Sequence, residues 1–260
     1  MDALRVLDDI PLAIDADEVL RFQGYKSGVD VPSSDVLALF DEALALGHTL
    51  MTPRAALARF SVTRDGDRLT ANGVTLTIPR IAERWGAVDE VVAGVCTIGA
   101  ALETHVAALW EARELPLAMM LDSVGSGAVE SLAEYVNDLL CQEGIAHGVK
   151  VTNRVSPGYG GWDVAEQRLL WRLCPGDAVS VTLNDSCFMT PTKTITILAG
   201  AGADARVDDY FSQCARCWMR DCAYRRTPAL RTVHMGGLEG PPNPPGRSEA
   251  PRRRRRGAPR

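Results

Sequence analysis

An apolar, β-branched run from Val91 to Gly99 constrains the fold more than any other segment of this sequence. A short apolar run of this kind predicts a buried strand. Alternating runs at Phe60 to Ile78 and at Lys193 to Leu198 predict further strands, and helical periodicity occurs between them. The two patterns are interleaved too irregularly for a doubly wound sheet, and no internal repeat is present. The sequence therefore predicts an α+β fold in which helices flank a central, largely antiparallel and twisted sheet.

A long helix is predicted in the middle of the chain, from near Pro116 to about Cys141. Gly125-Ser126-Gly127 interrupts its pattern, although a glycine in a helix interior costs roughly 1 kcal/mol relative to alanine. The two glycines do not follow a strand, so they are not a dinucleotide-binding fingerprint. We expect another element, or a ligand, to approach the helix closely at this point.

Charge is distributed unevenly along the chain. Of the net charge of −5, residues 231–260 contribute +6 from eight Arg and two Glu, so the rest of the chain carries −11. An acidic body argues against a specific nucleic-acid partner. The basic tail is rich in Gly and Pro and has almost nothing to bury, which predicts a disordered, solvated segment. We predict a mixed helical and hairpin subdomain at 1–85, a core at 86–228 and a disordered basic tail at 229–260.

The sequence has no pattern typical of a membrane span or a secretory signal. Its apolar runs are all shorter than the roughly 18 to 20 residues that a membrane span requires. The first nine residues are acidic and contain no basic region ahead of an apolar stretch, unlike a secretory signal. We therefore expect a cytoplasmic protein without a membrane partner.

Three cysteines lie within nine residues near the end of the predicted core, at Cys214, Cys217 and Cys222. In a cytosolic chain, close cysteines indicate a metal site rather than a disulfide framework. Cys187 is the best candidate for a fourth ligand, and four thiolates would suit zinc or an iron–sulfur cluster. The alternative is a group of reduced thiols without a ligand.

The segment Arg154-Val155-Ser156-Pro157-Gly158-Tyr159-Gly160 combines a fixed cation, a rigid turn and an aromatic hydroxyl. Arginine offers a planar, charged fork that suits a carboxylate or a phosphate. Proline fixes its own φ and extends the residue before it, and the glycine after it permits a turn conformation that a side chain would forbid. On residue chemistry alone, a surface β-turn preceded by an arginine is an equal alternative.

The order Arg-x-x-Pro-Gly-Tyr, followed by a helix, resembles the S-adenosylmethionine-binding motif in the activation domain of cobalamin-dependent methionine synthase. The whole chain is similar to the stand-alone activation-domain proteins of bacteria whose methionine synthase lacks that domain, most clearly from Val91 to Arg226. The segment Ala128 to Tyr135 resembles the helix before the motif, and Asp163 to Cys174 resembles the helix after it. Asp163 with Glu166 three residues later is a good N-cap arrangement for that second helix.

The resemblance implies roles for individual residues. Arg154 would hold the carboxylate of S-adenosylmethionine, and Ser156 would lend its backbone to the adenine or the amino group. Glu130 would lie near the methyl donor, and Tyr159 would meet the upper face of cobalamin. Without the resemblance, Glu130 is an exposed helical carboxylate and Tyr159 a tyrosine in a surface turn. The candidate cofactor-binding residues are Arg154, Ser156, Pro157, Gly158, Tyr159 and Gly160, and the candidate catalytic residues are Tyr159 and Glu130.

The sequence departs from the family pattern in three places. One of them is Gly160-Gly161-Trp162, which replaces the residues that usually follow the tyrosine. The family has an acidic residue a few positions before the arginine, where this chain has only His147 to Lys150. It also has a ligand-facing tyrosine after the closing strand, where this chain reads Ala199 to Gly202.

The function implied by the resemblance is that of an accessory protein for the reductive reactivation of cobalamin-dependent methionine synthase. The protein would bind S-adenosylmethionine and cap the cobalamin held by its partner. A flavodoxin or ferredoxin, or an iron–sulfur centre at the cysteines, would supply the electron. The alternatives are an activator of another corrinoid methyltransferase, a non-catalytic chaperone for a corrinoid protein, and a metal-binding module.

Overall fold

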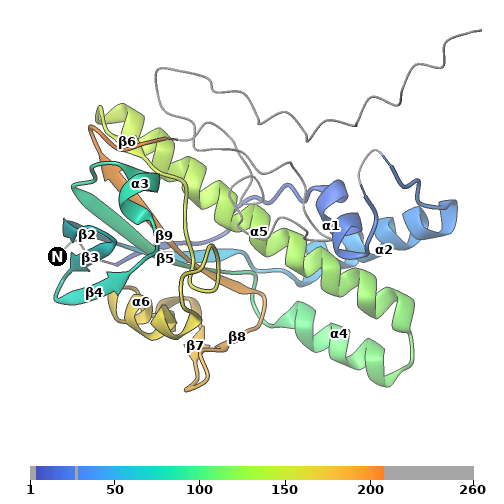
Figure 1. Cartoon of the computed structure of the whole chain (residues 1–260). Coiled ribbons are helices and arrows are strands. Elements are labelled where there is room, and N and C mark those ends of the chain that lie inside the picture. Colours follow the sequence, from blue (N-terminus) through green and yellow to red (C-terminus); the bar gives the residue numbers. More distant parts are fainter. Residues whose placement is uncertain (1–3, 27–28, 208–260) are drawn as a thin grey trace, which may run out of the picture.

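The fold is built on a seven-stranded antiparallel sheet, shown in Figure 1. The computed structural model describes residues 4–26 and 29–207. The strand order is β4-β3-β2-β5-β9-β6, and β1 pairs with β2 off this path. This arrangement confirms the predicted α+β class. The strands are β1 (Arg5–Leu7), β2 (Arg54–Asp65), β3 (Arg68–Ala71), β4 (Val74–Thr77), β5 (Glu90–Thr97), β6 (Lys150–Val151) and β9 (Thr194–Gly202).

Helices cover both faces of the sheet (Figure 1). The helices α1, α2, α4 and α5 contribute to one core cluster, and α3 and α6 contribute to the other. A two-stranded ribbon, β7 with β8, lies apart from the main sheet. The helices are α1 (Ala16–Phe22), α2 (Ser34–Leu50), α3 (Ile81–Trp85), α4 (Ala101–Glu111), α5 (Leu115–Ala146) and α6 (Gln167–Leu173), with 3-10 turns at Val164–Glu166 and Asp177–Val179, and the ribbon strands are β7 (Thr182–Leu183) and β8 (Met189–Thr190).

The predicted strand at Val91 to Gly99 is β5, the centre of the sheet. It pairs along its whole length with β2 on one edge and with β9 on the other. Side chains alternate between the faces of a strand, so Val92 and Cys96 enter the α5 core while Val91 and Val95 enter the opposite core. The strand therefore binds the two layers of the molecule together.

The two glycines inside α5 are sites of close approach by other elements, as expected. A Cβ at Gly125 would lie 2.8 Å from Cδ2 of Leu102 on α4 and 3.3 Å from Cε of Lys193. A Cβ at Gly127 would lie 3.0 Å from Cγ2 of Val19 on α1. Small residues thus let α1, α4 and the start of β9 pack against the same stretch of α5.

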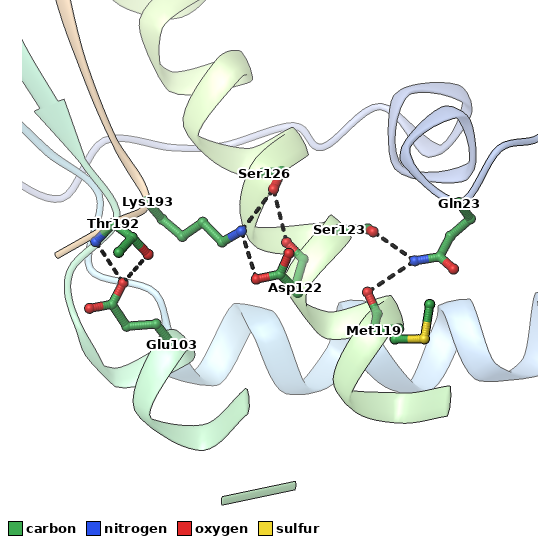
Figure 2. A network of polar contacts seen from close by, with 8 residues as sticks. All are labelled: Gln23, Glu103, Met119, Asp122, Ser123, Ser126, Thr192 and Lys193. Atoms are coloured by element: carbon green, nitrogen blue, oxygen red, sulfur yellow. Dashed lines mark hydrogen bonds and ion pairs between the residues drawn. The ribbon is translucent and has the colours of Figure 1, made fainter. Parts of the chain in front are cut away.

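Polar contacts join these elements to α5, as Figure 2 shows. Lys193 crosses the helix at Gly125, and its Nζ lies 2.7 Å from Oδ1 of Asp122 and 2.9 Å from Oγ of Ser126. Nε2 of Gln23, just after α1, donates to Oγ of Ser123 at 2.7 Å. The entry to β9 and the end of α1 are therefore held on one helix.

Strand β2 precedes residue 85 in the sequence and β5 follows it, and the two strands pair within one sheet. The division into segments 1–85 and 86–228 stays a prediction, and the tail at 229–260 lies outside the described residues. Within the part of the chain that the structure describes, none of the helices is long and apolar enough to cross a membrane.

Replacement of Gly144 by alanine should destabilise the protein, although alanine is the better helix former. An added Cβ would lie 2.7 Å from the carbonyl oxygen of Val149 and 2.8 Å from Cγ2 of Val151, where α5 turns into β6. Helix propensity favours the change by about 1 kcal/mol, but overpacking against backbone should leave a net loss of about 2 kcal/mol. Thermal or urea unfolding measures the difference, with the exposed Gln142→Ala as the control. A more stable Gly144→Ala variant would contradict this packing.

Candidate functional site

The edge of β9 that faces away from β5 positions the segment that carries the motif. After β6, the backbone N–H of Thr152 donates to the carbonyl of Gly200 at 2.8 Å. Val155 and Leu198 then exchange two backbone hydrogen bonds, of 2.9 and 2.8 Å. Arg154 lies between these anchor points, so the sheet fixes the backbone from which its side chain extends.

Arg154 forms an ion pair with Glu130 of α5. The Nη2 of Arg154 lies 2.7 Å from Oε2 of Glu130, and the two side chains are 7% and 22% exposed. A charge-assisted contact of this length, largely shielded from water, is stronger than an ordinary surface pair. The structure thus brings together two of the predicted site residues that are 24 positions apart in the sequence.

The motif turn runs from Ser156 to Trp162 and exposes Tyr159. The N–H of Tyr159 donates to the carbonyl of Ser156 at 3.2 Å, and the N–H of Gly158 donates to the carbonyl of Trp162 at 2.8 Å. Gly158 and Gly160 have φ of +88° and +60°, a region that favours glycine. Tyr159 is 55% exposed. The turn therefore holds an aromatic side chain out of the protein, as the sequence indicated.

The beginning of the turn is anchored by a buried polar chain. Oγ of Ser156 donates to the carbonyl of Thr196 on β9 at 2.6 Å. Oγ1 of Thr196 in turn donates to Oε1 of Gln167 on α6 at 2.9 Å. All three residues are buried, so these hydrogen bonds satisfy groups that have no access to water. The Ser156 side chain is thus engaged inside the protein.

The end of the turn is held by Glu166, a role that the sequence did not predict. Asp163 caps the following helical turn as expected, since its Oδ1 accepts from the N–H of Ala165 at 2.9 Å. Glu166 instead uses Oε2 to accept from Nε1 of the buried Trp162 at 2.7 Å and from the N–H of Thr77 at 2.8 Å. One carboxylate oxygen therefore ties the motif turn to the end of β4.

Two charged residues of α1 also belong to this neighbourhood. Partial burial raises the pKa of Tyr159, the Glu130 carboxylate raises it further, and Arg154 and Arg21 oppose the shift. Arg21 forms an ion pair with Glu18, which is only 4% exposed. Their spacing of three residues on a helix is visible in the sequence. Nothing in the sequence indicates that α1 lies beside the motif.

The buried cysteines of the core are not reactive groups. Burial raises the pKa of Cys96 and of Cys174 to about 12, so both thiols stay protonated at neutral pH. Sγ of Cys174 donates to the carbonyl of Ala56 at 3.4 Å. These two residues therefore belong to the core.

The predicted cysteine cluster falls mostly outside the described residues, which end at residue 207. Cys214, Cys217 and Cys222 lie beyond that limit. Cys187 is described, in the turn between β7 and β8 with a φ of +65°. No group of three His, Cys, Asp or Glu residues in the described ranges is arranged to hold a metal ion. A metal site at the four cysteines stays a prediction.

The site brings together three groups: the buried cation of Arg154, the partly exposed carboxylate of Glu130 and the exposed aromatic ring of Tyr159. Arginine suits a carboxylate, the glutamate suits a cationic centre, and an exposed tyrosine in a turn is available to a macromolecule. This set fits a ligand that carries both signs of charge.

The fold is similar to that of a solved structure, the MetH reactivation domain bound to AdoHcy, with a TM-score of 0.61. The likeness covers 81% of this chain and 81% of that chain, at 15% sequence identity. No family model matches the sequence, and no curated protein matches it either. At this level of identity the likeness shows the fold: the chain has the architecture of a reactivation domain.

Removal of the Glu130 charge should lower the pKa of Tyr159. In Glu130→Gln the repulsion between the phenolate and the carboxylate disappears, while Arg154 and Arg21 remain to stabilise the phenolate. Ultraviolet titration of each protein, minus the same titration of its Tyr159→Phe counterpart, isolates this one phenol. An unchanged pKa would mean that Glu130 and Tyr159 do not share an electrostatic environment.

Proposed function

We propose that this protein binds S-adenosylmethionine between α5 and the motif turn and serves the reductive reactivation of a cobalamin-dependent methionine synthase. The observation that carries the proposal is the Arg154–Glu130 pair at the base of an exposed Tyr159 turn. The fold of the reactivation domain, whose solved structure holds AdoHcy, supports it independently of the residues.

The charges of the site fit S-adenosylmethionine, which carries a carboxylate, an ammonium and a sulfonium. Arg154 would bind the carboxylate, because a guanidinium has five N–H donors and can serve more than one acidic group. Glu130 would then face the positive sulfonium. Glu18 and Arg21 add a second pair of opposite charges close by, on α1. A site with paired charges of both signs can compensate each charge of the ligand.

The residues of the turn would orient the ligand rather than react with it. Ser156, Pro157 and Gly158 would present backbone groups to the adenine or the amino group, and Gly160 lets the chain turn back beneath Tyr159. Tyr159 would lie against the corrinoid of the docked partner. The corrinoid supplies the metal that accepts the methyl group after one-electron reduction. This chain contributes proximity, by holding the methyl donor in line with that metal.

The partner and the electron source are further parts of the proposal. Methionine synthase is favoured, and another corrinoid protein is the alternative. A flavodoxin or ferredoxin would donate the electron, or an iron–sulfur cluster at Cys187, Cys214, Cys217 and Cys222 would relay it. Zinc at the same cysteines would make the cluster structural instead. Visible absorbance of the anaerobically purified protein separates these two cases.

Arg154→Ala should weaken the binding of S-adenosylmethionine by roughly 10- to 100-fold, because a charge-assisted contact to the carboxylate is lost. The affinity of Arg154→Lys should lie between those of Arg154→Ala and the wild type, since lysine keeps the positive charge but lacks the planar guanidinium. The double variant Arg154→Ala with Glu130→Gln removes the carboxylate that the single change leaves unpaired. Isothermal titration calorimetry measures all four proteins, with Arg59→Ala on β2 as the control.

Equal affinity of the wild type and Arg154→Ala would overturn this site. If the isolated wild type does not bind, the titration is repeated with the corrinoid-binding fragment of methionine synthase present. Binding in that mixture would mean that the site is completed by the partner. Its absence there would leave the chain as an interaction module for a corrinoid protein.

Glu130→Gln should distinguish S-adenosylmethionine from S-adenosylhomocysteine, which lacks the sulfonium charge. Loss of the carboxylate should weaken the binding of S-adenosylmethionine, which is cationic at sulfur. S-adenosylhomocysteine, a neutral thioether, should bind equally well or better, because Arg154 is released. We expect the affinity ratio of the two ligands to fall roughly tenfold. If Glu130→Gln weakens the binding of both ligands by the same factor, Glu130 acts only by positioning Arg154.

A further inference from the structure

A second arginine, Arg84 of α3, lies against the motif turn. A Cβ built at Gly160 would lie 3.3 Å from Nη1 of Arg84, so the guanidinium is directly beside the turn backbone. The residue is half-buried. Its Nε is fully covered and has no hydrogen-bond acceptor among the described residues. This donor is therefore an exception to the rule that buried polar groups are paired.

Glu83, the carboxylate next to Arg84 in the sequence, and Asp67, which contacts Arg80, are both engaged. Glu83 forms an ion pair with Arg80, with contacts of 2.8 and 2.9 Å. Asp67 accepts a hydrogen bond from the backbone N–H of Arg80 at 2.8 Å. Burial lowers the pKa of Arg84, and the positive charge of Arg80 lowers it further. An arginine remains charged despite such a shift, so a cation lies here without a carboxylate partner from the described chain.

This cation is distinct from the charges that surround Glu130. Arg84 extends from α3, which contributes to the opposite core cluster from α5. The turn is therefore flanked by an ion-paired cluster on one side and by Arg84 on the other.

The surface beside Arg84 has the composition of a protein-binding surface. Gly158, Tyr159, Gly160 and Gly161 are all exposed, and Val164 just after the turn is 55% exposed. Aromatic residues and arginine are the residue types that most often anchor protein interfaces. Arg84 is half-buried in the free protein. Binding would therefore cost less side-chain entropy than it would for a fully exposed arginine.

We propose that Arg84 binds a carboxylate side chain of the corrinoid protein that docks on the motif turn. The inference rests on the proposed function, because the identity of the docked partner comes from that proposal. A carboxylate would accept from the terminal Nη groups of the guanidinium, because Nε is covered, and would supply the missing counter-charge. Arg84 would thus fix the orientation in which Tyr159 meets the partner, without contact to S-adenosylmethionine.

The test measures association of the full chain with the cobalamin-loaded corrinoid-binding fragment of methionine synthase. Arg84→Gln should weaken association about tenfold and flatten its dependence on salt concentration, because one interfacial charge pair is lost. Arg84→Lys should recover part of the affinity. Arg113→Gln, in the turn between α4 and α5, is the matched loss of one positive charge and should have no effect. Affinity for S-adenosylmethionine should be equal in all four proteins.

The outcomes separate this inference from the proposed function. A wild type that binds neither the fragment nor S-adenosylmethionine overturns both. Wild-type binding to the fragment that is unchanged in Arg84→Gln overturns the role of Arg84 alone. An Arg84→Gln variant that also loses S-adenosylmethionine would place Arg84 in the ligand site instead. If the Arg84 dependence disappears when cobinamide, which lacks the nucleotide phosphate, replaces cobalamin, the anion is that phosphate and the carboxylate assignment is wrong.

Discussion

Pairing of β5 on both edges is the constraint on which the rest of the structure depends. The strand is hydrogen-bonded to β2 and to β9, and its alternate side chains enter both cores. Because β9 is fixed by β5, the segment that pairs with the other edge of β9 is fixed too. The positions of Arg154 and Ser156 therefore derive from the sheet.

The two flanks of the motif turn differ in their charge balance. On the α5 side, Arg154 and Glu130 form one pair and Arg21 and Glu18 another, so the charges compensate one another. On the α3 side, the half-buried Arg84 has no carboxylate partner within the described chain. A compensated cluster suits a small ligand with charges of both signs, whereas an isolated cation suits an acidic group from outside. The two flanks of the turn thus differ in the kind of group that they suit.

Local patterns in the sequence predicted much of the fold. The buried strand at Val91, the long helix after Pro116 and the Asp163 cap each depend on residues that are close in the chain, and each is present. The order Arg-x-x-Pro-Gly-Tyr also indicated the exposed turn. Contacts between distant segments could not be predicted in this way. The approach of α1 to the motif and the partners of Glu166 depend on how the helices pack against the sheet.

The carboxylate of Glu166 has a consequence for how this site can be moved between proteins. It holds Trp162 of the turn and the backbone of Thr77 through a single oxygen atom. The turn is therefore braced against a hairpin through a contact between residues 89 positions apart in the sequence. A graft of the motif with its flanking helices alone would lack this brace, and a chimera that keeps the motif must carry the β3–β4 hairpin with it.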